Sequence, residues 1–203
     1  IYITGAGVAS PFGDDLESVW QALLSPLEPR RYSLCAGDRI RSVRAHITEA
    51  ARYEADAEEY FVFLCRRALE GLLAQFPLER RKRGCLLLGT GMGASDHGLS
   101  EEPIPAHWEE RLLRRVTDGL ADALPAIWTA NACCAGGQAV AYGCDLLRTG
   151  AFDYVIAGGA EAFSYLTWAG FERLNAIDPQ GCRPFDRSRQ GIGVGDGAVF
   201  FAL

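Results

Sequence analysis

Two adjacent cysteines, Cys133 and Cys134, stand where a catalytic nucleophile is expected in an α/β protein. The segment Ile127-Trp128-Thr129-Ala130-Asn131-Ala132-Cys133-Cys134-Ala135-Gly136-Gly137 reads as an apolar strand, then small residues, then a helix. Such a sharp turn lifts a side chain out of the sheet, and small neighbours let a substrate approach. The helix N-terminus, with its partial positive charge and its N–H groups, stabilises thiolate, which is the reactive form of cysteine. The spacing is therefore consistent with a nucleophilic cysteine at this turn and does not by itself choose between Cys133 and Cys134. The alternative is that Cys133 and Cys134 are buried structural thiols, since most unpaired cysteines pack as small apolar side chains.

The cysteines and histidines taken together form no metal or disulfide pattern. The number of cysteines is odd, no CxxC pair occurs, and the histidines lie far apart. A zinc site or a disulfide framework would show closer and more regular spacing. We therefore expect no metal, and reduced cysteines in a cytoplasmic protein. The residues concerned are Cys35, Cys65, Cys85, Cys133, Cys134, Cys144 and Cys182, with His46, His97 and His107.

The opening Ile3-Thr4-Gly5-Ala6-Gly7 invites comparison with a dinucleotide-binding turn, but the residues that follow argue against one. Ser10 stands where the third glycine of GxGxxG would fall, and Pro11 comes next. A proline there blocks the chain from continuing promptly into the phosphate-binding helix. The glycine clusters at 89–93 and 191–197 lack the Lys-Ser/Thr of a P-loop. We expect no nucleotide cofactor.

Length and composition indicate one folded domain over residues 1–203. Hydrophobic residues make up 49% and charged residues 23%, which is enough apolar material for a packed core. The net charge of −6 argues against a nucleic-acid-binding protein, which normally shows a basic face. No apolar run reaches the roughly 18–20 residues of a membrane span. The start of the chain lacks the basic region of a signal peptide.

The pattern of apolar residues predicts helices alternating with strands. Such alternation predicts a mostly parallel sheet covered on both faces. Residues 25–55 read as irregular apart from a strand expected at 40–47. Residues 95–106 read as a polar loop, and the stretch 163–197 reads as rich in loops. Asp14 is the expected N-cap of the first helix. The predicted helices are at about 15–24, 56–75, 107–122 and 135–148, and the predicted strands at about 1–4, 85–88, 126–130, 154–157 and 198–203.

Four motifs follow one another along the chain in a recognisable order. They are ITGAGVASPFG…VWQALL at the start, Ala132-Cys133-Cys134-Ala135-Gly136, the stretch from Leu146 to Gly158-Gly159-Ala160-Glu161, and Arg183-Pro184-Phe185-Asp186…Arg189-Gln190-Gly191…Gly195-Asp196-Gly197-Ala198. In this order the chain resembles the N-terminal half of a β-ketoacyl synthase, a condensing enzyme of the thiolase superfamily. The resemblance assigns the nucleophile to Cys133 rather than to Cys134, because Cys133 aligns with the cysteine of the family's Ala-Cys-Ser-Ser-Gly.

The chain departs from the family pattern at several positions. Cys134 and Ala135 replace two serines, Asn131 stands where threonine is common, and Asp196 replaces a glutamate. The segment between Gly93 and Cys133 is shorter than in common fatty-acid synthases. In the family this segment contributes to the dimer interface and the acyl pocket, so the resemblance does not fix chain-length preference.

The resemblance also implies a second half that this chain lacks. Family members carry two histidines and a lysine there, and the histidines stabilise the enolate of the malonyl thioester. None of the histidines of this chain falls in such a motif. We therefore expect residues 1–203 to be an N-terminal synthase domain that is inactive in condensation when alone.

The fold implied is the α/β thiolase-like half, a five-stranded mixed sheet with helices on both faces. The activity implied is acyl transfer in fatty acid or polyketide synthesis: Cys133 holds an acyl group, and malonyl-acyl carrier protein condenses with it after losing carbon dioxide. The implied partners are acyl carrier protein and, through strand 126–130, a second identical or synthase-like subunit. The resemblance implies no metal, no redox cofactor, no nucleic acid and no membrane.

Two other functions share this fold. One is a non-catalytic partner of the chain-length-factor type, which lacks the cysteine; the presence of Cys133 argues against it. The other is a thiolase-type enzyme that uses coenzyme A esters; the Pro-Phe-Asp and Gly-Gly-x-Glu elements favour the synthase.

Overall fold

The structure is a computed structural model of the chain. It describes residues 1–24, 29–36, 39–49, 53, 56–78, 82–93, 106–120, 124–178 and 180–203, without the side chains of 34–36 and 39–41. His97, most of the loop predicted at 95–106 and the side chain of Cys35 lie outside the described residues.

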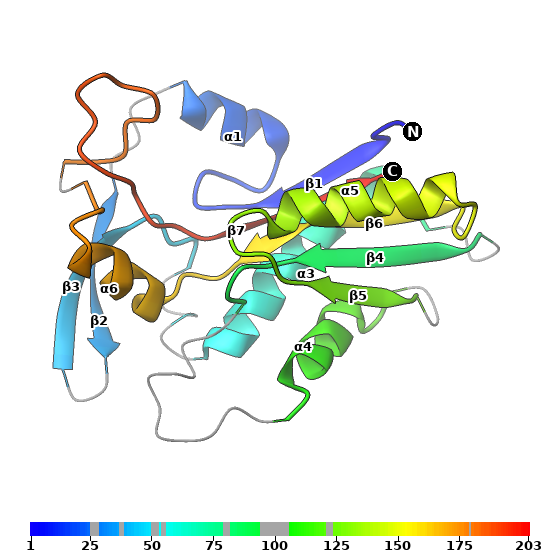
Figure 1. Ribbon diagram of the computed structural model, residues 1–203, viewed down its shortest axis with the longest axis horizontal. Coiled ribbons are helices and arrows are strands. Elements are labelled where there is room, and N and C mark those ends of the chain that lie inside the picture. Colours follow the sequence, from blue (N-terminus) through cyan, green and yellow to red (C-terminus); the bar gives the residue numbers. More distant parts are fainter. Residues whose placement is uncertain are drawn as a thin grey trace.

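A five-stranded sheet in the order β1-β7-β6-β4-β5 forms the centre of the fold (Figure 1). Strands β6, β4 and β5 are parallel, whereas β7 runs antiparallel to both β6 and β1. The sheet is therefore mixed, as the resemblance implies, and four of its five strands run in the same direction, as the alternation of helices and strands predicts; β7 is the exception. The reason is that β7 begins beside the end of β6, where Glu161 pairs with Gly197, and runs back along it. The strands are β1 (Gly5–Ala9), β4 (Gly84–Gly89), β5 (Ala126–Thr129), β6 (Tyr154–Glu161) and β7 (Gly197–Ala202).

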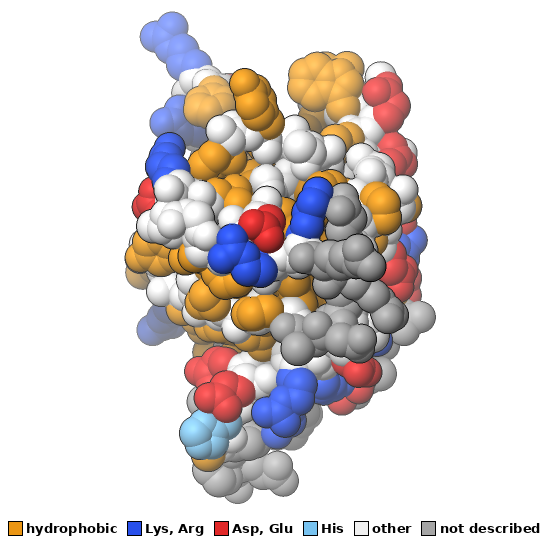
Figure 2. All heavy atoms as spheres, turned by 90° about the vertical axis from the view of Figure 1, so that its right-hand side faces the viewer, with side chains coloured by type: hydrophobic (Ala, Val, Ile, Leu, Met, Phe, Trp, Pro, Cys, Tyr) orange, Lys and Arg blue, Asp and Glu red, His pale blue; other side chains and the backbone are white. Residues whose placement is uncertain are grey.

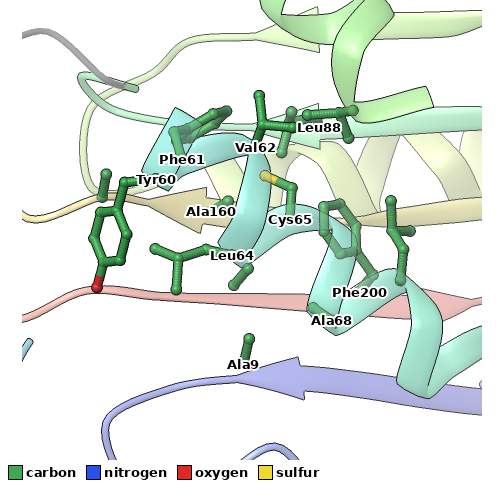
Figure 3. Packing of buried hydrophobic residues seen from close by; sticks show 14 of the residues in the cluster. Ala9, Tyr60, Phe61, Val62, Leu64, Cys65, Ala68, Leu88, Ala160 and Phe200 are labelled. Carbon is green, nitrogen blue, oxygen red and sulfur yellow. The ribbon is translucent and has the colours of Figure 1, made fainter. Parts of the chain in front are cut away.

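Helices cover both faces of this sheet. On one face lie α3 (Ala57–Gln75) and α4 (Trp108–Thr117), and on the other lies α5 (Ala135–Arg148). The strand period of two explains both layers, because neighbouring residues of β7 point to opposite faces. Phe200 packs in the α3 layer and Phe201 in the α5 layer. Figure 3 shows the buried side chains of α3 against the strands beneath them.

The first strand and the first helix differ from the sequence prediction. Strand β1 occupies residues 5–9 rather than 1–4. Its glycines serve packing rather than a turn, since a Cβ at Gly7 would lie 2.0 Å from the carbonyl oxygen of Ala68 in α3.

Helix α1 (Leu16–Leu23) is capped by Asp15, whose carboxylate accepts a 2.8 Å hydrogen bond from the N–H of Ser18. Asp14, the predicted cap, instead forms an ion pair with Arg67.

Two further elements lie where the sequence reading expected irregular chain or loop. Strands β2 (Arg30–Ala36) and β3 (Arg39–Ala45) pair in an antiparallel hairpin. Strand β3 corresponds to the strand expected at 40–47, and its partner β2 was not predicted. Helix α6 (Tyr165–Arg173) lies within the stretch 163–197, which was predicted to be rich in loops. Ser164 caps this helix by accepting a hydrogen bond from the N–H of Thr167. Helix α4 ends at Thr117, earlier than the predicted 122.

Both chain ends lie at the amino ends of the parallel strands (Figure 1). That face mixes hydrophobic side chains with acidic and basic ones (Figure 2). Arg83, directly before β4, and Asp153, directly before β6, form an ion pair at this end of the strands. In the part of the chain that the structure describes, no helix is both long and apolar enough to cross a bilayer. The turn that carries Cys133 lies at the opposite, carboxyl end of the strands.

Candidate active site

Cys133 lies in the short turn between β5 and α5, and its side chain is exposed. Two backbone hydrogen bonds tighten the turn, from the N–H of Cys134 to the carbonyl of Asn131 at 3.0 Å and from the N–H of Ala135 to that of Ala132 at 3.2 Å. Ala132 has a φ of +45°, a left-handed conformation that is strained for a residue with a Cβ atom. The strain sits one residue before the cysteine, at the bend where the strand turns into the helix.

Three glycines allow the start of α5 to rest directly on the sheet. A Cβ at Gly89 would lie 2.2 Å from the carbonyl oxygen of Ala135, and a Cβ at Gly159 would lie 2.9 Å from the Cα of Gly136. No side chain fits into these contacts between β4, β6 and α5. The close packing fixes the height of the helix N-terminus above the sheet, and with it the position of Cys133.

A cavity of about 740 Å³ opens at this end of the sheet and includes Cys133 in its wall. Adjacent Cys134 is also exposed but is not among the residues that line the cavity. The wall is built from the turns after β4, β5 and β6, from α6 and from the segment that enters β7. Its residues are Gly89, Thr90, Gly91, Met92, Ala132, Cys133, Ala135, Gly136, Gly159, Ala160, Glu161, Ala162, Ser164, Thr167, Gly170, Phe171, Leu174, Val194, Gly195 and Gly197.

The other cysteines with described side chains are less accessible than Cys133 and Cys134. Cys65 and Cys85 are buried, and burial raises the pKa of both thiols, that of Cys85 to about 11. Thiols in such surroundings are unreactive. Cys144 and Cys182 are half-buried.

Glu161, at the end of β6, places a carboxylate in the cavity wall. Its Oε2 accepts hydrogen bonds from the N–H of Gly91 at 2.8 Å and from the hydroxyl of Thr90 at 3.2 Å, and its Oε1 accepts one from the N–H of Met92 at 2.9 Å. Burial raises the pKa of Glu161, and these hydrogen bonds oppose the rise. Sequence reasoning quoted this residue only as part of a motif. Its position as the last residue of the buried strand β6, directly after Gly158-Gly159-Ala160, is the signal that could have marked it.

Asp196 anchors a second part of the cavity wall. Its carboxylate accepts hydrogen bonds of 2.6 Å from the hydroxyls of Tyr60 and Thr48. Burial raises the pKa of Asp196, and the hydrogen bonds again oppose the rise. The aspartate therefore ties the cavity-lining residues Val194 and Gly195 to α3 and to the segment after β3.

The two described histidines lie outside the cavity wall. The ring of His46 packs against Phe12, with 5.2 Å between ring centroids, and burial lowers the pKa of His46. His107 is exposed at the start of α4, and its Nδ1 lies 3.6 Å from Oε1 of Glu110. Within the described ranges, no group of three or more His, Cys, Asp or Glu side chains is arranged to hold a metal ion.

Comparison with known proteins finds similarity to ketosynthases. Residues 125–203 match the family model "Beta-ketoacyl synthase, N-terminal domain". The whole chain aligns with Nodulation protein E of Rhizobium leguminosarum bv. trifolii at 26% identity and with 3-oxoacyl-[acyl-carrier-protein] synthase 2 of Staphylococcus aureus (strain COL) at 23% identity. It spans 57% of the length of each. Among solved structures, the ishigamide ketosynthase/chain length factor aligns with a TM-score of 0.75 at 24% identity, over 98% of this chain and 57% of that one.

These comparisons confirm the resemblance to the N-terminal half of β-ketoacyl synthases. The fold class implied by that resemblance, a thiolase-like α/β half with a mixed five-stranded sheet and helices on both faces, is confirmed as well. The assignment of Cys133 as the nucleophile remains a prediction, which the geometry of the turn and the cavity supports.

Proposed function

We propose that this chain forms the acyl-accepting half of a β-ketoacyl synthase, with Cys133 as the acyl acceptor. The observation that carries the proposal is the position of Cys133, exposed in the wall of a cavity and two residues before α5 begins. An anionic sulfur there is stabilised by the positive end of the helix. The match of residues 125–203 to the synthase domain covers this turn, and both aligned relatives extend over the whole chain.

The chemistry begins with transfer of an acyl group to Cys133. The thiolate attacks the carbonyl carbon of an acyl thioester, the carrier thiolate leaves, and an acyl-cysteine thioester forms. Malonyl thioester then loses carbon dioxide, and the resulting carbanion attacks the acyl carbon, releasing the Cys133 thiolate and the 3-oxoacyl product. Negative charge develops on the carbonyl oxygen in both acyl steps. Backbone N–H groups at the turn, including that of Cys133, are the proposed donors to this oxygen.

The groups that stabilise the malonyl-derived carbanion are proposed to come from outside residues 1–203. Neither His46 nor His107 lines the cavity that contains Cys133, and the chain spans 57% of the aligned relatives. We accordingly propose that this chain alone does not condense acyl and malonyl thioesters.

Acyl carrier protein is the proposed donor of both thioesters. The printed name of one relative, 3-oxoacyl-[acyl-carrier-protein] synthase 2, supports this donor over coenzyme A. A synthase-like partner subunit is also proposed, because a structural neighbour is a ketosynthase/chain length factor. Its contact is proposed to involve β5, which forms one edge of the sheet.

The test is a condensation assay on the full-length protein that contains this chain. With acyl and malonyl carrier protein, we expect formation of a 3-oxoacyl product, which is lost in Cys133→Ala and retained in Cys134→Ala. Product formed from coenzyme A esters but not from carrier protein would instead identify a thiolase-type enzyme. No acylation and no product with either donor would contradict the proposal and favour a non-catalytic subunit.

A further inference from the structure

Both oxygens of the Glu161 carboxylate accept hydrogen bonds from one turn of the chain, residues 90–93. Oε2 accepts hydrogen bonds from Gly91 and Thr90, and Oε1 accepts one from Met92. A carboxylate whose two oxygens both accept bonds from backbone N–H groups is poorly placed to act as a base toward a ligand. Its geometry is that of a clamp on the turn that follows β4.

The clamped turn also contacts the end of β5 on its other side. The N–H of Thr90 donates a 3.0 Å hydrogen bond to the carbonyl of Thr129, the last residue of β5. The turn is closed internally, since the N–H of Gly93 donates a 2.7 Å hydrogen bond to the hydroxyl of Thr90. The turn is therefore tied at once to the ends of β5 and β6.

Gly91 lies between the carboxylate of Glu161 and Ala132, the residue before Cys133. A Cβ on Gly91 would lie 3.2 Å from Oε2 of Glu161 and 3.4 Å from the carbonyl oxygen of Ala132. Ala132 holds the left-handed conformation that aims the chain into the Cys133 turn. Such a strained residue persists only where its surroundings fix it, and the clamped turn lies beside its carbonyl group.

We propose that Glu161 is a positioning residue for Cys133: it pins the turn of residues 90–93 against the carbonyl of Ala132 and thereby fixes the bend from which Cys133 enters the cavity. This inference rests on the proposed function, in which Cys133 accepts the acyl group. A carboxylate suits the task because Gly91 and Met92 present two successive N–H donors to two acceptor oxygens. Glutamine offers one oxygen, and its NH₂ group would face an N–H donor.

The test compares Glu161→Gln with wild-type full-length protein in two reactions of Cys133. The first is acylation by a simple acyl thioester of N-acetylcysteamine, followed by peptide mass mapping. The second is alkylation by limiting iodoacetamide, read as the ratio of Cys133 to Cys134 labelling. We expect Glu161→Gln to slow acylation about tenfold or more, because small displacements of a reacting group are costly, and to change the alkylation ratio. Glu172→Gln, which removes a carboxylate from an exposed position on α6, is the matched control and should react as wild type.

Labelling of the buried Cys65 and Cys85 separates positioning from unfolding. With both protected, wild-type acylation and an unchanged alkylation ratio in Glu161→Gln would overturn the inference. If Glu161→Gln exposes Cys65 and Cys85 to labelling, the variant Gly91→Ala is used in its place. Its methyl group enters the space between Glu161 and the carbonyl of Ala132, while the carboxylate of Glu161 is kept. A wild-type rate and ratio in Gly91→Ala would then overturn the inference. Failure of the wild-type protein to acylate Cys133 contradicts the proposed function, and the alkylation ratio alone then decides whether Glu161 positions the thiol.

Discussion

A Cβ atom on Gly159 would lie 2.9 Å from the Cα of Gly136, so β6 and the first turn of α5 touch backbone to backbone. We expect Gly159→Ala to lower the free energy of unfolding by about 1–3 kcal/mol, because both sides of the contact are backbone and neither yields readily. The same variant should slow acylation of Cys133 by pushing the helix start away from the sheet. Urea unfolding and peptide mapping measure the two effects.

Gly137→Ala is the matched control for this contact. A Cβ on Gly137 meets nothing within 4 Å, and alanine in a helix is favoured over glycine by about 0.5–1 kcal/mol. Equal unfolding free energies and equal acylation rates for Gly159→Ala and Gly137→Ala would show that the close approach of β6 and α5 neither stabilises the fold nor positions Cys133.

The hydroxyl of Tyr60 provides a second test of the cavity wall. It donates a 2.6 Å hydrogen bond to Asp196 and accepts a 3.1 Å hydrogen bond from the N–H of Glu49. Tyr60→Phe removes one hydrogen bond from the carboxylate of Asp196 and one from the N–H of Glu49, in largely buried surroundings. We therefore expect the free energy of unfolding to fall by about 1–3 kcal/mol. Tyr142→Phe, which removes an exposed hydroxyl on α5, should change it by less than about 0.5 kcal/mol. Identical urea midpoints for the two variants would be the contrary result.

The raised pKa of Glu161 predicts how its contribution to stability changes with pH. A carboxyl whose pKa in the folded state exceeds its ordinary value of 4.5 binds its proton more tightly when folded. Its contribution is therefore greatest below that value and declines as pH rises through the folded-state pKa. The unfolding free energy of wild type minus that of Glu161→Gln should accordingly fall as pH rises from about 4.5 toward neutrality. Urea unfolding across this range measures the difference, and a difference that grows with pH would contradict a raised pKa for this carboxyl.

Strand β5 predicts the oligomeric state. It lies at the edge of the sheet, and Ile127 on it is 42% exposed. Edge strands with exposed apolar side chains pair readily with another chain, and a lysine discourages this pairing. We expect the wild-type protein to sediment as a dimer, Ile127→Lys as a monomer, and the control Leu166→Lys, with a similarly exposed leucine on α6, as a dimer. A monomeric wild type at micromolar concentration would show the prediction to be wrong.

The parts of the fold that were predictable from sequence are those governed by local pattern. The predicted helix at 135–148 coincides with α5, and the helix predicted at 56–75 matches α3 within one residue, because their apolar positions recur at helical spacing. The turn at Cys133 was also predictable from local pattern, because a short strand, small residues and a helix follow one another directly along the chain.

The features that the sequence reading missed depend on contacts between distant segments. Gly7 looks like a turn residue until Ala68 is seen against it. The cap of α1 moves to Asp15 because Asp14 pairs with Arg67, far along the chain. The clamp by Glu161 likewise needs the turn after β4, about 70 residues earlier, to be brought beside the end of β6. Such pairings follow from the sheet order, which periodicity alone does not give.

The location of the acyl group tests the account most directly. Full-length protein is incubated with acyl carrier protein that carries a labelled acyl chain, then digested and mapped by mass spectrometry. The account predicts one acyl group per chain, on Cys133, absent in Cys133→Ala and present in Cys134→Ala. An acyl group on Cys134 or on any other residue, or no stable acylation of a folded protein, would contradict it.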